Sequence, residues 1–128
     1  MHEFHAALNA ALRRRGGWVD AFYHCPFHRD AALPEYRHAD HPDRKPNPGM
    51  ILRAMAEQEV DPECSFLIGD RESDIAAAAA AGIAGLRFEG GNLESLVAKA
   101  LADPPRPARQ ASVLPPSPDH PPRQAERR

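Results

Sequence analysis

One short segment of the chain places two carboxylates where an apolar run gives way to a helix. Gly69-Asp70 ends the run, and Asp74 follows four residues after Asp70. Open α/β sheets bind ligands beyond the carboxyl ends of their strands, and Gly69 lets the backbone turn closely there. Magnesium keeps most of its waters and needs only one or two protein carboxylates beside a phosphate. The pair therefore fits a magnesium site, with Asp74 either binding the metal through water or orienting its neighbours.

A second segment, residues 44–49 (RKPNPG), supplies the complementary charge ahead of another helix. The Lys45 ammonium could offset charge that develops during phosphoryl transfer, and the Arg44 guanidinium could grip a phosphate or hydroxyl as a fork. Plainer interpretations exist for each segment alone. Gly-Asp-x-x-x-Asp is frequent by chance, Asp74 could simply cap a helix, and Lys-Pro often marks an extended turn. The occurrence of both segments in this order favours a phosphate site.

The elements that must position these residues alternate between helix and strand along the chain. Periodicity predicts an amphipathic helix over residues 3–15, ended by Gly16-Gly17, and the run WVDAFY at 18–23 predicts a buried strand. A long polar loop follows over 26–48, with five prolines and three histidines, and such loops are usually functional. The remaining predicted elements are a helix over 47–59 capped by Asn47, a strand over 64–68, a helix over 73–81, a strand over 83–88 and a helix over 92–102. This alternation indicates a parallel α/β sheet.

Composition excludes several classes of protein. A formal net charge of -2 gives no basic footprint for nucleic acid, and no run approaches the roughly 20 apolar residues that span a bilayer. Cys25 and Cys64 lie far apart, and the N-terminus has no apolar leader with a cleavage site, which indicates a reduced, cytoplasmic protein. Cys64, at the start of a predicted buried strand, is interpreted as a small core residue without a chemical role.

The last part of the chain differs in composition from the rest. Residues 103–128 hold eight of the fourteen prolines and few sizeable apolar residues, so they predict a disordered proline-rich tail after a domain at 1–102. The stretches at 104–107 (PPRP) and 115–118 (PPSP) could also offer a polyproline helix to a protein partner. Such tails are more often simple linkers.

Taken together, the order of motifs resembles a known family. Tyr-x-Cys-Pro at 23–26, a loop, Arg-Lys-Pro-x-Pro-Gly-Met at 44–50 and Gly-Asp-x-x-x-Asp at 69–74 are similar to the histidinol-phosphate phosphatase branch of the haloacid dehalogenase (HAD) superfamily. The likeness covers residues 4–101. It implies an α/β fold of the HAD-like, Rossmann-type, three-layer sandwich class.

The resemblance also implies a reaction and roles for the residues. The reaction would be magnesium-dependent hydrolysis of a phosphate monoester on a small sugar bisphosphate, through an aspartyl-phosphate. Lys45 would stabilise the phosphoryl group, Arg44 would bind substrate, and Asp70 would be a magnesium ligand with Arg71 beside it, while Asp74 would be the supporting carboxylate. Two alternatives stay open: a histidinol-phosphate phosphatase-like enzyme, and a non-catalytic phosphate-binding or protein-interaction remnant.

Two departures from the family pattern concern the nucleophile and a phosphate-binding turn. The 128 residues contain no Asp-x-Asp motif and no Thr-Asn-Gln-Ser-like turn, both of which the family carries on strands near its N-terminus. We therefore expect a domain that is incomplete at the N-terminus and gives no phosphatase turnover alone. We also expect a sheet split by a gap, and self-association through its unpaired backbone groups.

The loop leaves a question about zinc. Several relatives hold zinc there with Cys-x-His and a later Cys-x-Cys, but Phe27 takes the histidine position and His41 and Asp43 take the cysteine positions, so only Cys25 matches. A shifted tetrahedral zinc set would consist of Cys25, His28, His38 and His41. The favoured alternative is a loop held by its prolines and by packing of Phe27, Leu33 and Tyr36, with exposed histidines.

Overall fold

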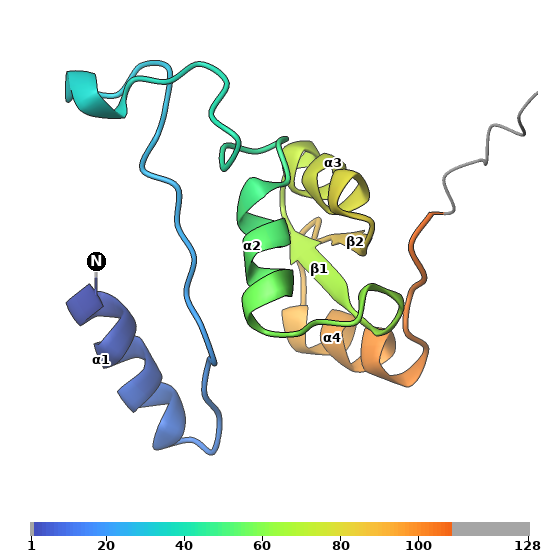
Figure 1. Cartoon of the computed structure of the whole chain (residues 1–128). Helices are drawn as coiled ribbons and strands as arrows, with labels where there is room; N and C mark the ends of the chain where they lie inside the picture. Colours follow the sequence, from blue (N-terminus) through green and yellow to red (C-terminus); the bar gives the residue numbers. More distant parts are fainter. Residues whose placement is uncertain (1, 109–128) are drawn as a thin grey trace, which may run out of the picture.

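The computed structural model describes residues 2–108, so the predicted tail lies outside the described residues from position 109 onward. Figure 1 shows a packed α/β unit formed by the later part of the chain and an extended arm formed by the earlier part. The elements in order are α1 (His2–Arg13), a 3-10 turn (Pro34–Tyr36), α2 (Gly49–Glu57), a second 3-10 turn (Pro62–Cys64), β1 (Phe66–Gly69), α3 (Glu72–Ala81), β2 (Ala84–Arg87) and α4 (Leu93–Ala102).

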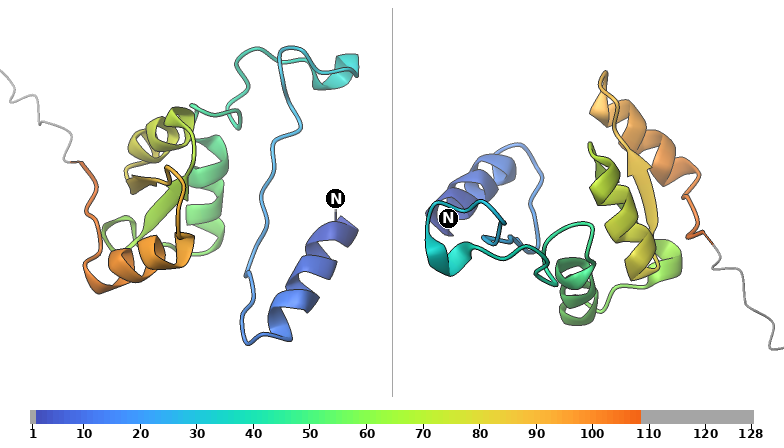
Figure 2. Two further views of the ribbon diagram at one scale, coloured as in Figure 1. Left: turned by 180° about the vertical axis from the view of Figure 1, so that it is seen from behind. Right: turned by 90° about the horizontal axis from the view of Figure 1, so that it is seen from above.

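Strands β1 and β2 form a parallel pair joined by α3, which confirms the predicted α/β class. The register places Phe66 opposite Ala84 and Gly69 opposite Arg87. Seen from above in Figure 2, α3 covers one face of the pair and α4 lies on the other, giving three layers. The buried apolar residues all belong to this unit: Ala77, Ala78, Ile83, Ala84 and Ala100.

Helix α3 packs closely because its buried side chains are small. Ala77 and Ala78 are completely buried, and a Cβ on Gly85 of β2 would lie 3.2 Å from the Cβ of Ala78. The helix ends at Gly82, whose φ of 81° is the left-handed conformation that glycine adopts without steric cost. Short side chains on both surfaces let the helix axis approach the strands.

Helix α2 packs against α3 and confirms the helix predicted over residues 47–59. It begins later than predicted, at Gly49. Pro48 is the N-cap, and no side chain caps the helix there. The Asn47 side chain instead donates to the Asp40 carboxylate at 2.8 Å and to the His41 carbonyl at 3.0 Å. Asn47 was therefore wrongly predicted as the cap, because its amide ties the preceding loop together.

The strand predicted over residues 18–23 is wrong. The segment has no sheet partner among the described residues, and Trp18 is 65% exposed. The Asn9 side chain of α1 satisfies Val19 instead, accepting its N–H at 2.7 Å and donating to its carbonyl at 2.8 Å. The backbone N–H and carbonyl groups of a strand need a neighbouring strand as hydrogen-bond partner. Here the Asn9 side-chain amide bonds these groups of Val19 instead.

The two strands are not separated by the expected gap. β1 and β2 are direct neighbours, and within residues 2–108 no strand pairs with the other edge of β1. All four β1 residues are half-buried. This arrangement is an incomplete Rossmann-like sheet, with the opening beside β1 instead of between the two strands.

The predicted burial of Cys64 is also wrong. The cysteine is exposed and ends a 3-10 turn that Asp61 initiates by accepting the Glu63 N–H at 3.0 Å. The nearby Asp61 carboxylate raises the pKa of the Cys64 thiol. The strand begins two residues later, at Phe66, because the Asp-Pro turn uses the residues before it.

After α4 the chain returns along the outer side of β2 as an irregular strap over residues 103–108. Pro105 and Pro107 are half-buried. Pro105 lines a hollow on the α3 side and another on the α4 side, so the strap passes the outer edge of β2. The described part of the tail therefore packs on the domain. No helix among the described residues has the length and apolarity needed to cross a membrane.

Candidate phosphate and metal site

A polar cavity of about 270 Å³ opens at the carboxyl end of β1. Its lining comes from two segments far apart in sequence, the loop before α2 and the turn between β1 and α3. The lining residues are Arg44, Lys45, Asp70, Arg71 and Ser73. The structure thus brings together the two segments that the sequence singled out.

Asp74 lies beneath this cavity and holds it together. Its side chain is 7% exposed, and one carboxylate oxygen accepts the Lys45 ammonium in an ion pair. The other oxygen accepts the backbone N–H of Arg71 at 3.0 Å. With both oxygens engaged by the protein, Asp74 acts as the partner that orients Lys45 and the turn.

Gly69 allows this arrangement because a side chain there would occupy the space of Asp74. A Cβ built on Gly69 would overlap the Asp74 Cβ and lie 2.5 Å from a carboxylate oxygen. The last residue of β1 is therefore restricted to glycine by close approach, since its own φ is ordinary.

The charge state of Asp74 follows from its partners. The hydrogen bond from Lys45 lowers the pKa of the Asp74 carboxyl; burial opposes that shift, and the Arg71 N–H adds to it. The carboxylate is therefore ionised at neutral pH, and Lys45 keeps a fixed counter-charge at the cavity floor.

Asp70 and Arg71 extend into the open part of the site. Both are exposed, and no hydrogen bond or ion pair engages the Asp70 carboxylate within residues 2–108. A carboxylate oxygen at a cavity wall is a suitable ligand for magnesium. Because Asp74 is committed to Lys45, Asp70 is the carboxylate of this pair that could hold a metal.

Arg44 is held at the cavity rim by its backbone. Its N–H donates to the His41 carbonyl at 2.8 Å, and its carbonyl accepts the Asn47 N–H at 2.9 Å. These two bonds form consecutive turns around Lys45. Ser73, in the first turn of α3, was missed by sequence reasoning because nothing distinguishes one serine beside Gly-Asp from any other.

The loop histidines share a pattern that the sequence analysis also missed. In each His-x-Asp triplet the histidine Nδ1 accepts the aspartate backbone N–H, at 3.0, 3.2 and 3.1 Å. The three histidines are His28, His38 and His41. The fourth member of the predicted zinc set, Cys25, directs its Sγ to the Phe27 carbonyl at 3.8 Å. No group of three or more His, Cys, Asp or Glu that could hold a metal occurs within the described residues.

The predicted packing of the loop is wrong in part. Phe27 is half-buried, but Leu33 is 54% exposed and Tyr36 is 38% exposed. The loop folds back through backbone bonds instead: the His28 N–H donates to the Tyr36 carbonyl at 2.9 Å, and the His28 carbonyl accepts the His38 N–H at 3.1 Å. Only the Phe27 end is covered by other side chains.

Comparison with known proteins identifies the class. The model of the HAD-hydrolase-like family matches residues 43–114, which include the whole cavity and the packed α/β unit. The chain belongs to this family, and its fold is that of a HAD-like phosphatase.

The most similar relatives share one activity by name. The chain is 44% identical over 98 residues to a D-glycero-beta-D-manno-heptose-1,7-bisphosphate 7-phosphatase of Rhodopseudomonas palustris, covering 76% of this chain and 53% of that protein. It is 38% identical over 76 residues to the corresponding alpha-heptose enzyme of Burkholderia mallei, covering 59% of this chain and 40% of that protein. The chain therefore spans about half, or less, of the length of these relatives.

A solved structure supports the fold. The 1.50 Å crystal structure of a protein described as a HAD-like phosphatase, from Mesorhizobium loti, superposes with a TM-score of 0.61 at 29% identity. The match covers 76% of this chain and 52% of that one.

Proposed function

We propose that this chain carries the phosphate-handling part of a magnesium-dependent phosphatase that acts on a small sugar bisphosphate. The observation that carries the proposal is the cavity at the end of β1, where three cationic side chains and one available carboxylate converge. The relatives named as heptose-1,7-bisphosphate 7-phosphatases support a sugar bisphosphate as the substrate class.

The three cationic residues of the cavity each have a role in this proposal. Lys45, fixed by Asp74, offsets negative charge on the transferred phosphoryl group. Arg44 presents a planar fork to a phosphate or hydroxyl of the substrate, and Arg71 adds positive charge on the other side. Because Lys45 is already oriented before substrate binds, little reorganisation is needed when charge develops.

Asp70 is the residue that would hold magnesium. Its carboxylate faces the cavity from the end of β1, and magnesium binds through one or two carboxylates together with waters and substrate phosphate. The ion would neutralise phosphate charge when bound. Zinc in the loop is not part of this proposal.

The 128 residues do not supply the nucleophile of such a reaction. Phosphate monoester hydrolysis through a covalent intermediate needs an activated carboxylate facing the phosphorus, and the chain has no Asp-x-Asp motif. We therefore expect these residues alone to bind phosphate without hydrolysing a sugar bisphosphate.

Calorimetric titration with inorganic phosphate in the presence of magnesium tests the binding role. Lys45→Met is expected to weaken binding about tenfold, since a fixed cation at the floor is lost. Lys99→Met, on α4 and outside the cavity, is the control and should bind like the wild type. Equal affinities for the two variants would contradict the proposed site.

A turnover assay separates enzyme from binding protein. Release of phosphate from a sugar bisphosphate by the pure chain, abolished by Asp70→Asn, would show that a nucleophile exists among these residues and would contradict the expected inactivity. Binding without release supports the second candidate, a non-catalytic phosphate-binding protein, which the absent motif favours for the 128 residues taken alone.

A protein-interaction role for the PPRP stretch is less well supported. Pro105 and Pro107 are half-buried against the α3–β2 region rather than presented as a free polyproline helix. A partner would have to displace them first.

A further inference from the structure

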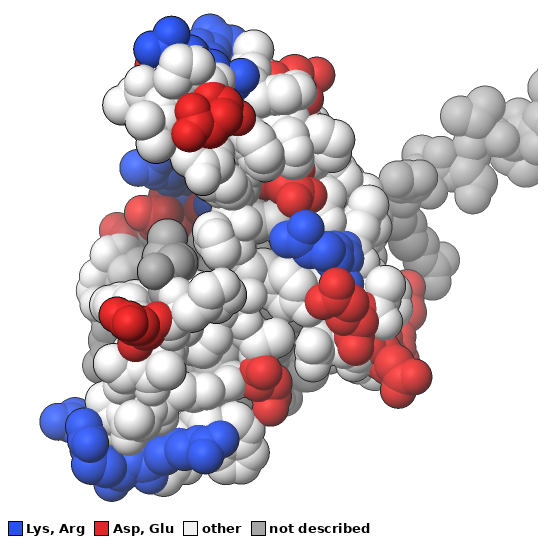
Figure 3. Space-filling model, turned by 60° about the vertical axis from the view of Figure 1, so that its left-hand side comes forward, with Lys and Arg blue, Asp and Glu red and all other residues white. Residues whose placement is uncertain are grey.

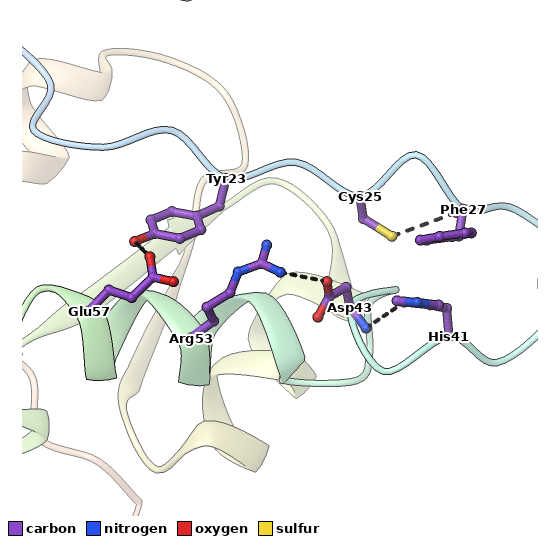
Figure 4. Close-up of polar contacts among 7 residues, drawn as sticks. All are labelled: Tyr23, Cys25, Phe27, His41, Asp43, Arg53 and Glu57. Atoms are coloured by element: carbon purple, nitrogen blue, oxygen red, sulfur yellow. Dashed lines mark hydrogen bonds and ion pairs between the residues drawn. The ribbon is translucent and has the colours of Figure 1, made fainter. Parts of the chain in front are cut away.

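Two segments of the arm meet at a stacked pair of rings. Phe27, in the first of these segments, and His41, in the second segment just before Lys45, stack with centroids 3.9 Å apart and planes 15° from parallel (Figure 4). The His41 Nδ1 accepts the Asp43 N–H at 3.1 Å, which fixes the orientation of the ring. The stack therefore closes the intervening loop at its base.

Arg53 of α2 lies between the same two segments. Its guanidinium donates to an Asp43 carboxylate oxygen at 3.1 Å, and its Cζ lies 5.5 Å from the centroid of the Tyr23 ring. The Tyr23 hydroxyl in turn donates to Glu57, one helical turn further along α2, at 2.6 Å. Figure 4 shows Arg53 reaching from the helix toward both the arm and the loop.

The turn that receives these contacts has little room to move. The Gly49 N–H donates to the Pro42 carbonyl at 2.9 Å, and a Cβ on Gly49 would lie 2.5 Å from an Asp43 carboxylate oxygen. Asp43 is thus held between the start of α2 and Arg53. Since Arg44 follows directly, with its N–H bonded to the His41 carbonyl at 2.8 Å, the position of Asp43 sets that of Arg44.

We propose that Tyr23, Phe27, His41, Asp43 and Arg53 form a clamp that positions Arg44 and Lys45 over the cavity, with Arg53 as its central positioning residue. The clamp works through ring stacking, a cation over an aromatic face and one ion pair. The effect of the clamp on phosphate binding rests on the proposed function, whereas its effect on the position of the loop does not.

A matched pair of variants tests the role of Arg53. Arg53 is 44% exposed and pairs with Asp43 at 3.1 Å; Arg87 is 47% exposed and pairs with Glu72 at 3.2 Å, away from the loop. Each is changed to Met, which keeps the length of the side chain. Circular dichroism is recorded first, and both variants are expected to keep the wild-type helix content. Met is a good helix former at position 53 of α2, and position 87 lies in β2 with its side chain half exposed.

The main readout is hydrogen exchange at the backbone amides of Arg44 and Asn47, which form the turns around Lys45. Arg53→Met is expected to raise exchange at both amides about fivefold or more, whereas Arg87→Met leaves them unchanged. The exchanged pair Asp43→Arg with Arg53→Asp should restore much of the protection. Equal exchange in the two Met variants overturns the proposal.

Two further measurements distinguish the clamp from a loop held by a bound metal or by phosphate. Addition of a chelator to the wild type is expected to leave these amides unchanged; faster exchange would mean that a metal holds the loop, and would overturn the clamp. In phosphate titration Arg53→Met should weaken binding about fivefold. If the wild type itself does not bind phosphate, the proposed function fails, and the exchange data still decide whether the clamp exists.

Discussion

The packed α/β unit and the N-terminal arm are stabilised in different ways. From β1 to α4 the chain buries five apolar residues in a three-layer unit (Figures 1 and 2). The arm, residues 2–42, contains no buried residue, and Phe4, Trp18 and Leu33 are each more than half exposed. The unit depends on close packing, whereas the arm is attached by separate polar and aromatic contacts.

This difference explains why the candidate site is built at the junction of the two. Asp70 and Asp74 belong to the packed unit and have fixed positions, while Arg44 and Lys45 come from the end of the loop. A loop without a core needs individual contacts to keep its place, and the Lys45–Asp74 ion pair and the clamp supply them. On the face shown in Figure 3 basic groups gather at the top and at the bottom of the view, and acidic groups lie mainly between them.

Gly69→Ala should produce the largest effect. The added methyl would overlap Asp74 and force the end of β1 away from α3, and a loss of about 3 kcal/mol in the free energy of unfolding is expected. Gly17→Ala is the control, since nothing lies within 4 Å of a Cβ there. Urea unfolding followed by circular dichroism measures both. A Gly69→Ala protein as stable as Gly17→Ala would contradict the close packing of this junction.

Ala78→Leu tests the packing of α3 itself. Ala78 is completely buried, and overpacking there should cost about 2 kcal/mol, while Ala80→Leu on the exposed side should change stability by about 0.5 kcal/mol or less. The same urea assay applies. Similar losses at both positions would mean that the unit is no better packed than the arm.

Asp74→Asn tests the junction through pH. The pKa of Asp74 is lower in the folded chain than in the unfolded one. The stability that the ionised carboxylate contributes is therefore fully present above the ordinary carboxyl range and is lost as pH falls through the folded pKa. At pH 7 the variant should lose about 1.5 kcal/mol, because hydrogen bonds to a charged group are removed. The difference from wild type should shrink on progressive acidification below the ordinary carboxyl range. A pH-independent difference would contradict the assigned ion pair.

Trp18→Ser should have the smallest effect. Trp18 is the single tryptophan, is 65% exposed and bonds only to the neighbouring Asp20 within the described residues, so stability should change by about 0.5 kcal/mol or less. In the wild type its fluorescence should be quenched efficiently by iodide. Strong protection from iodide would show that the arm is covered in solution.

The sequence predicted the packed unit well because its signals are local. An apolar run, an alanine-rich helix ended by glycine and a second run define β1, α3 and β2, and parallel topology then places Asp70 at the ligand-binding edge. The order of the two motifs suggested that Lys45 and Asp70 serve one site, and the structure places both in the wall of the same cavity.

The arm was predicted less well because its structure depends on what surrounds it. The run at 18–23 has strand propensity, but propensity alone cannot supply a partner strand. Cys64 was misassigned because the turn initiated by Asp61 uses the first residues of the apolar run. At the loop, the sequence suggested packing for Phe27 and a possible zinc ligand in His41, but a short motif does not reveal that the two rings stack on each other or that Asp43 pairs with Arg53.

The strap over residues 103–108 affects which edge of the sheet a further strand could join. Proline has no N–H to donate, so Pro105 beside the outer edge of β2 offers a poor template for another strand, whereas the edge of β1 stays available. Within the described residues, a new strand therefore meets less obstruction at β1 than at β2. Two chains of these residues joined through β1 would each present the edge beside Pro105 outward, which disfavours further growth by strand pairing.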